Sequence, residues 1–176
     1  MNIGKYYQLE KKLRYSVIDV GSGLMILLVF PNNYVVLFDC NVNKDSEESI
    51  LDYMREIIPG RWDEQEQKNS KWIDLFICSH RDVDHVRGLK LVRAQFVIKE
   101  IWDSGQFGES TQGDEYKYYM ELRRQIRKEY GDDAVKVPIP SINPMLTGEG
   151  VTITCINSAL DFSSTKTYET TANLRN

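Results

Sequence analysis

The segment His80-Arg81-Asp82-Val83-Asp84-His85 places two imidazoles and two carboxylates in six consecutive residues and contains both histidines of the chain. Zinc, manganese and iron are bound by neutral imidazole nitrogen together with carboxylate oxygen, whereas calcium and magnesium prefer shells of oxygen alone. The spacing therefore predicts a metal site with His80, Asp82, Asp84 and His85 as ligands. Zinc is the expected metal, with manganese and iron as alternatives. The competing interpretation is a solvated acidic loop with two incidental histidines.

The geometry of such a segment favours one or two ions. Positions 80 and 82 point to the same side of an extended loop, while 84 and 85 follow a turn and can face the same cavity from the other side. Two adjacent ions activate a shared water and neutralise charge on the attacking and leaving oxygens, as phosphodiester hydrolysis requires. Arg81 and Arg87, which alternate with the acids, are expected to face outward or to act as counterions.

The elements around the segment indicate how it is positioned. An apolar run of strand length, residues 72–78, precedes it and would deliver the ligands to the end of a buried strand. Residues 15–20, 24–30 and 34–38 predict an antiparallel meander that ends at Asp39, and the apolarity of its second and third strands indicates burial on both faces. A helix is expected from a cap at Asp45 to Ile58. The polar residues 61–71 predict a surface loop.

The later elements alternate strands with helices. A short helix is expected over residues 89–96, a strand over 97–102, a Gly-rich loop over 104–113, an amphipathic helix over 114–130, and strands over 135–137 and 151–156. The string Leu146-Thr147-Gly148-Glu149 is interpreted as a turn. The pattern predicts a mixed α/β fold with helices over a mainly antiparallel or mixed sheet.

Composition is that of one soluble globular domain: 176 residues, 41% hydrophobic, 27% charged, with a net charge of -4. This charge gives no indication of nucleic-acid or membrane binding. No apolar run approaches the roughly 18 residues of a membrane span, and the amino terminus lacks an apolar signal core, so a cytoplasmic protein without a membrane partner is expected. Cys40, Cys78 and Cys155 lack the spacing of a disulfide framework or zinc knuckle and are expected to be small buried hydrophobes.

The ligand spacing resembles the metallo-β-lactamase superfamily signature H-x-H-x-D-H, with Asp82 in place of the second histidine. The form H-x-D-x-D-H-x-x-G is similar to the metallo-β-lactamase-like domain of the competence protein ComEC and its stand-alone relatives. The "DVGQGD" strand that opens those domains is echoed by Ile18-Asp19-Val20-Gly21-Ser22-Gly23. Arg87 departs from the pattern, because it replaces the first glycine of the usual pair.

This resemblance implies an αββα sandwich and a metal-dependent hydrolase, a phosphodiesterase or nuclease that uses metal-bound hydroxide. It assigns metal binding to the signature residues and a further catalytic role to Asp84, which helps to position the water nucleophile. It also implies that Asp39 orients the ligands without binding metal itself. Phosphodiesters, including nucleic acid, are the substrates that the resemblance suggests.

Other features of the superfamily are absent. No histidine follows His85 and no Thr-Gly-Asp string follows the signature. Residues 1–157 are therefore expected to form a partial domain, with the first half complete and the second half partial, and residues 158–176 a polar tail leading into a missing strand. An incomplete second sheet would expose edges and apolar surface, so self-association or a partner chain is expected.

Two hypotheses about function follow. The first is the metal-dependent hydrolase. The second is a catalytically incomplete domain that acts as a binding or assembly module, which the total of two histidines favours. A phosphate cradle at Gly21-Ser22-Gly23 is disfavoured, because no helix-forming segment follows it.

Overall fold

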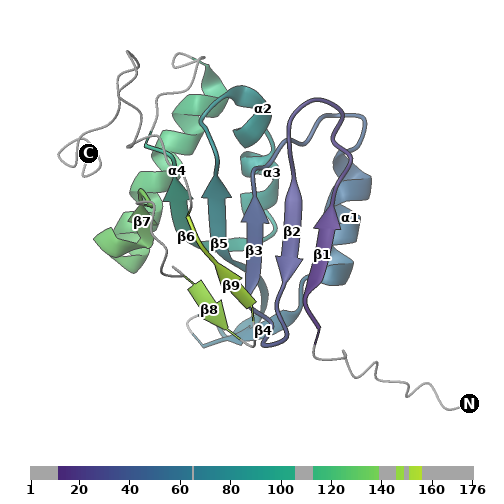
Figure 1. Cartoon of the computed structure of the whole chain (residues 1–176), viewed down its shortest axis with the longest axis vertical. Coiled ribbons are helices and arrows are strands. Elements are labelled where there is room, and N and C mark those ends of the chain that lie inside the picture. Colours follow the sequence, from purple (N-terminus) through teal and green to yellow (C-terminus); the bar gives the residue numbers. More distant parts are fainter. Residues whose placement is uncertain (1–11, 65, 106–112, 139–145, 149–150, 156–176) are drawn as a thin grey trace, which may run out of the picture.

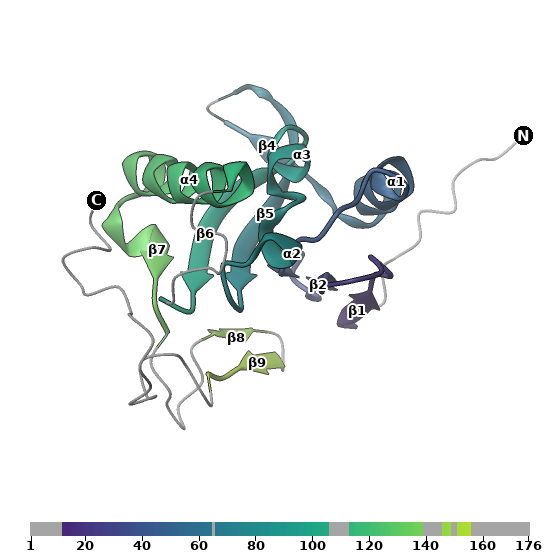
Figure 2. The same cartoon turned by 90° about the horizontal axis from the view of Figure 1, so that it is seen from above.

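The computed structural model describes residues 12–64, 66–105, 113–138, 146–148 and 151–155. Its central sheet has the strand order β1-β2-β3-β5-β6-β7, with β4 paired to β5. Helices cover one face of this sheet, and the β8–β9 hairpin lies on the opposite side (Figures 1 and 2). The α/β class predicted from the sequence is confirmed, and the sheet is mixed.

The predicted antiparallel meander is present at one side of the sheet. It consists of β1 (Arg14–Val17), β2 (Ile26–Val29) and β3 (Val35–Phe38), each paired antiparallel with the next. Burial on both faces of β2 and β3 is also confirmed. Leu27 and Leu37 belong to the core under the helices, whereas Leu28 and Val36 belong to a second apolar cluster on the other face.

The other main strands run parallel to β3. They are β5 (Lys68–Cys78), β6 (Val97–Asp103) and β7 (Val135–Lys136). Phe38 pairs with Ile77, and Cys78 pairs with Asp103, so β3, β5 and β6 end side by side. Segments that leave the carboxyl ends of neighbouring parallel strands converge on one edge, where α/β proteins place their ligands. The predicted ligand segment leaves β5 at this edge.

Four α-helices lie among the described residues: α1 (Glu47–Ile57), α2 (Val83–Val86), α3 (Leu89–Arg93) and α4 (Asp114–Tyr130). A short 3₁₀ helix, η1 (Asp132–Ala134), follows α4. The bounds of α4 agree with the prediction. The predicted cap at Asp45 is wrong, because the residue at the N-cap of α1 is Ser46. The side chain of Asn43 accounts for the difference: its Oδ1 accepts hydrogen bonds of 3.0 Å from the backbone N–H groups of Asp45 and Ser46.

The surface loop predicted for residues 61–71 is wrong. Residues Gly60–Asp63 form β4, which pairs antiparallel with the first part of β5 from Asp63↔Lys68 to Gly60↔Lys71. The polar side chains of β4 lack the apolar alternation that indicates a strand. Ionic contacts, in addition to the backbone pairing, hold this hairpin. Arg61 donates to both carboxylate oxygens of Asp74, at 2.9 and 2.6 Å.

The turn predicted for residues 146–149 is also wrong over its first three residues. β8 (Leu146–Gly148) pairs antiparallel with β9 (Val151–Ile153). Val151 and Ile153 pack against the second apolar cluster, so tertiary packing selects an extended conformation. That cluster comprises Leu28, Phe30, Val36, Leu75 and Trp102. Residues 158–176, the expected polar tail, and residues 106–112 of the expected Gly-rich loop lie outside the described part of the chain.

The main core lies between the sheet and the helices. Phe76 of β5 and Tyr119 of α4 are fully buried and meet edge to face, with ring centroids 6.3 Å apart. Cys40 and Cys78 are buried as expected, whereas Cys155 is half-buried. None of the helices that the structure describes is both long and apolar enough to cross a membrane.

Candidate metal centre

The four predicted ligands lie together at the carboxyl edge of the parallel strands. His80 and Asp82 are in the loop after β5, and Asp84 and His85 are in the short helix α2. The rings of His80 and His85 are in contact, with centroids 3.6 Å apart and a tilt of 44°. The structure therefore brings the two histidines together.

The ligands form two pairs, each of one imidazole and one carboxylate. His80 Nδ1 lies 3.1 Å from Oδ2 of Asp82, and His85 Nε2 lies 3.7 Å from Oδ2 of Asp84. Two ligands at the usual zinc distances of about 2.0–2.2 Å and a tetrahedral angle are about 3.4 Å apart. Both separations are close to this value, so each pair fits two positions on one ion.

The Nδ1 atom of His80 adds a second observation in favour of metal binding. It is a buried atom with no hydrogen-bond partner, since its short separation from Asp82 lacks the angle of a hydrogen bond. A buried polar atom without a partner loses about 1–3 kcal/mol of solvation, and native proteins rarely leave one unexplained. A bound cation would satisfy this lone pair.

Among the described residues, no group of three or more His, Cys, Asp or Glu side chains is close enough together to hold a metal ion. The four predicted ligands, expected to serve one or two ions, therefore lie here as two pairs, with the two histidine rings in contact. The donor set fits a divalent metal in its chemistry, and each pair supplies two of the three or four protein ligands that such sites use.

Asp39 orients one of the histidines. Its Oδ2 lies 2.7 Å from His85 Nδ1 and accepts a hydrogen bond of 2.6 Å from the hydroxyl of Ser79, while its Oδ1 accepts one of 2.8 Å from the Ser79 backbone N–H. The carboxylate is fully buried and directly follows β3. Asp39 thus connects the end of β3 to both ends of the ligand segment.

The tautomer of His85 follows from this contact. An ionised carboxylate can only accept hydrogen bonds, so in the neutral ring Nδ1 carries the proton. The lone pair is then on Nε2, which is the ring nitrogen that faces Asp84. A carboxylate that fixes the tautomer and orientation of a metal-binding histidine is a recurrent feature of metal sites. This geometry supports the role expected for Asp39.

The ligand helix is also joined to the segment after β3 by backbone contacts. The N–H of Cys40 donates to the carbonyl of His85 at 2.7 Å, and the N–H of Gly88 donates to the carbonyl of Cys40 at 2.8 Å. A side chain at Gly88 would collide with Val42. The glycine of the signature is therefore required for the close approach of α2 to this segment.

The turn after β1 packs directly on the ligand segment. Gly23 has φ +96°, and a Cβ at this position would overlap the carbonyl oxygen of Asp84. Gly21 has φ +72°, but its surroundings are open. The turn therefore acts as a support for the ligand helix, which explains why glycine is needed there without any phosphate.

Replacing Gly23 by alanine is expected to lower the free energy of unfolding by about 2–5 kcal/mol. Left-handed backbone costs a side-chain-bearing residue about 1–2 kcal/mol, and overpacking against the Asp84 carbonyl adds about 1–3 kcal/mol. Urea unfolding followed by circular dichroism measures the change. Gly21→Ala is the matched control, because it has the same type of backbone strain without a collision. Equal losses in both variants would contradict the proposed packing.

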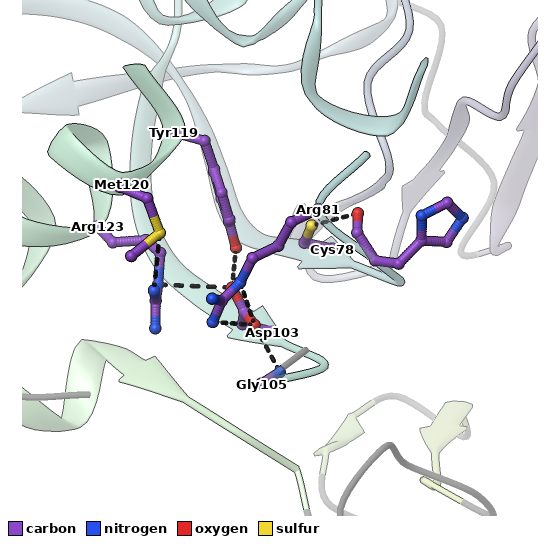
Figure 3. A network of polar contacts seen from close by, with 8 residues as sticks. Cys78, Arg81, Asp103, Gly105, Tyr119, Met120 and Arg123 are labelled. Atoms are coloured by element: carbon purple, nitrogen blue, oxygen red, sulfur yellow. Dashed lines mark hydrogen bonds and ion pairs between the residues drawn. The ribbon is translucent and has the colours of Figure 1, made fainter. Parts of the chain in front are cut away.

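An unpredicted buried ionic network lies beside the ligand segment. Arg81, expected to face outward or to act as a counterion, is fully buried and pairs with Asp103 at the end of β6 (Figure 3). Tyr119 and Arg123 of α4 contact the same carboxylate. The outward orientation is therefore wrong and the counterion role is correct. Arg87 is exposed.

A usable signal for this network existed in the sequence. Asp103, like Asp39, comes at the end of an apolar run of strand length. The family resemblance assigns a role to Asp39 alone. An acidic residue at the end of a buried strand can therefore form a structural ion pair instead of orienting a metal ligand.

Burial and charge shift several pKa values around this network. Burial acts to raise the pKa of Asp103, but the charges of Arg123 and Arg81, with hydrogen bonds from Arg81 and Tyr119, outweigh it and hold that pKa below its ordinary value. Burial, aided by the charge of Asp103, raises the pKa of Tyr119 and of the Cys78 thiol. Asp103 is thus ionised and Tyr119 and Cys78 are neutral at neutral pH.

No family model, no curated protein and no solved structure matches this chain.

Proposed function

We propose that this chain is a metal-dependent hydrolase of the metallo-β-lactamase superfamily that acts on phosphodiesters. The observation that carries the proposal is the contact of Asp39 with His85, which leaves Nε2 of His85 facing Asp84 next to the ring of His80. This arrangement pairs a nitrogen donor with a carboxylate oxygen at the spacing of two ligands of one ion. Each pair would supply two of the three or four protein ligands that a divalent cation uses.

Each residue has a distinct part in this proposal. His80 and Asp82 would hold one ion and Asp84 and His85 a second, or all four would share one. The side chain of Asp84 is 35% exposed, so it can reach solvent and orient an attacking water while it contributes a ligand oxygen. A bound divalent cation would lower the pKa of the water bound to it and would neutralise negative charge on the phosphate.

The αββα sandwich remains part of the proposal. The β8–β9 hairpin lies across the sheet face opposite the helices (Figure 2), and its Val151 and Ile153 pack on that face. This placement is consistent with a second sheet facing the first. The hairpin therefore supports the sandwich. Extension of the two-stranded β8–β9 sheet by self-association or by a partner chain is part of the proposal.

A binding or assembly module is the second candidate. The chain contains two histidines, and its ligands form pairs where metal enzymes of this type use three or four protein ligands for each ion. In this case the loop would bind metal weakly and the domain would act through its surfaces.

Metal analysis separates the two candidates. The hydrolase proposal predicts near-stoichiometric metal in purified protein and mutant-sensitive hydrolysis of a generic phosphodiester such as bis(p-nitrophenyl) phosphate. Both His80→Ala and Asp84→Asn remove a ligand, so each is expected to weaken metal binding by more than the roughly 10- to 100-fold loss typical of an outer-shell partner. Elemental analysis and competition with a chromophoric chelator measure metal content and affinity.

Arg87→Ala is the matched control, because Arg87 is exposed and directly follows α2 without contributing a ligand. It should leave metal content and hydrolysis unchanged. Negligible metal in the unmodified protein, unaffected by either ligand substitution, would reject the hydrolase and favour the module.

A further inference from the structure

We propose that Asp103 is a positioning residue for the metal centre, which acts by holding Arg81 in the middle of the ligand segment. The inference rests on the proposed metal site and goes beyond it, because it assigns a role to a strand and a helix that contribute no ligand. Figure 3 shows the side chains of Arg81, Tyr119 and Arg123 converging on Asp103.

The contacts of Asp103 come from three parts of the chain. Arg81 donates through Nε to both carboxylate oxygens, at 3.1 and 3.0 Å, and through Nη2 to Oδ1 at 2.8 Å. The hydroxyl of Tyr119 donates to Oδ2, and Nε of Arg123 lies 3.4 Å from the same oxygen. The backbone N–H of Gly105 donates to Oδ1 at 2.6 Å. Both oxygens are therefore engaged, and Asp103 is a structural anchor for the loop.

The position of Arg81 in the sequence connects this anchor to the metal ligands. Arg81 lies between His80 and Asp82, and successive side chains of an extended segment point to opposite sides. Drawing Arg81 into the interior thus turns both neighbours to the other side, where His80 meets His85. The 3.1 Å separation of His80 Nδ1 and Asp82 Oδ2 places these two neighbours on the same side. The backbone at Asp82 has φ -73° and ψ 157°.

A second contact fixes the same part of the loop. The thiol of Cys78 donates to the carbonyl of His80 at 3.0 Å. The backbone on the amino-terminal side of Arg81 is therefore held by β5 while the side chain of Arg81 is held by β6.

The energetics of buried ion pairs favour a role beyond stability. Desolvation of a buried pair offsets much of its Coulombic attraction, and replacement by apolar groups is often neutral or stabilising. A fully buried Arg81–Asp103 pair is thus an inefficient way to stabilise a loop. It is an effective way to define one geometry, because the bidentate contact restricts both the distance and the angle of the guanidinium.

The test compares metal binding, loop order and stability in matched variants. Asp103→Asn removes the charge at constant shape, and the double substitution Arg81→Met with Asp103→Leu removes both charges, which keeps the experiment informative if the single variant unfolds. Asp74→Asn is the control. It breaks another largely buried Asp–Arg contact of β5, with Arg61, but next to Val35 at the opposite end of the parallel strands.

The probes are Zn²⁺ and Co²⁺ alone. Both network variants are expected to bind Zn²⁺ about 10- to 100-fold more weakly, the usual effect of losing a group that orients ligands. They should also change the visible absorption of bound Co²⁺, which reports coordination geometry. In metal-free protein, hydrogen exchange of residues 79–85 should accelerate by at least about 10-fold relative to Asp74→Asn. The control should lose stability with unchanged metal affinity.

Unchanged Zn²⁺ affinity and unchanged exchange in both network variants would overturn the positioning role while leaving the metal site intact. A parallel decrease of affinity in Asp74→Asn would also overturn it, because general destabilisation would then account for the effect. Absence of Zn²⁺ binding by the unmodified protein would instead reject the proposed function, and with it the role of Asp103 toward a metal. Accelerated hydrogen exchange of residues 79–85 in the network variants would then show only that Asp103 anchors the loop.

Discussion

Replacement of Asp39 by asparagine is expected to weaken metal binding by about 10- to 100-fold and to lower the free energy of unfolding by about 1–3 kcal/mol. The buried carboxylate faces three donor groups, the N–H and hydroxyl of Ser79 and the Nδ1–H of His85. An amide supplies one acceptor oxygen, so a donor would face the NH₂ group. His85 would then lose its fixed tautomer and its orientation toward Asp84.

Asparagine is the informative substitution because of the backbone at this position. Asp39 has φ +48°, a conformation that aspartate and asparagine tolerate better than other side-chain-bearing residues. Asp39→Asn therefore removes charge and acceptor capacity without adding backbone strain, which alanine would add. The loss of affinity can thus be assigned to the contact with His85.

Isothermal titration with Zn²⁺ measures the affinity, and urea unfolding of the metal-free protein measures the stability. Asp19→Asn is the control, because Asp19 is an exposed carboxylate whose contact is the neighbouring Gly21 N–H at 3.0 Å. Asp19→Asn removes the same charge at a position close to Gly21. It should leave both the Zn²⁺ affinity and the free energy of unfolding nearly unchanged. A Zn²⁺ affinity in Asp39→Asn equal to that of the control would contradict the role assigned to Asp39.

Truncation of Phe76 to alanine is expected to cost about 3–5 kcal/mol of the free energy of unfolding. Phe76 lies in β5 and is fully buried in the main core. Its ring meets the ring of Tyr119, whose hydroxyl donates to Asp103. The cavity would therefore remove packing energy and loosen the helix that contacts the Asp103 network.

Chemical unfolding followed by far-ultraviolet circular dichroism measures this loss. Phe76→Leu retains most of the apolar volume and should cost much less than alanine, while Trp62→Ala, on an exposed residue of β4, should change stability by no more than about 0.5 kcal/mol. If Phe76→Ala destabilised the protein no more than Trp62→Ala does, the core position of β5 would be refuted.

Much of the fold was determined by local patterns in the sequence. The bounds of α4 agree with the prediction, because apolar residues repeat at helical spacing between Asp114 and Gly131. The meander was predictable because short apolar runs alternate with Gly- and Pro-containing turns. The apolar run before Ser79 likewise predicted the end of β5. In each case the signal lies within one element and its flanking residues.

The errors at β4 and β8 arose where contacts with other segments select the local structure. β4 is polar, but its pairing with β5 and the contact of Arg61 with Asp74 make it a strand. β8 resembles a turn by composition, yet it pairs with β9, which packs on the sheet. At the start of α1 the side chain of Asn43 accepts a hydrogen bond from the backbone N–H of Ser46, and the N-cap is Ser46 instead of Asp45.

The candidate metal site divides in the same way. The sequence by itself determined the four ligand types and their spacing, since these depend on chemistry and on position along the chain. Tertiary structure alone decided that His80 contacts His85, that Asp39 contacts Nδ1 of His85, and that Arg81 is buried against Asp103. The physical reason is that β3, β5 and β6 are parallel and end side by side. Residues far apart in the chain are therefore joined by a register that no local pattern specifies.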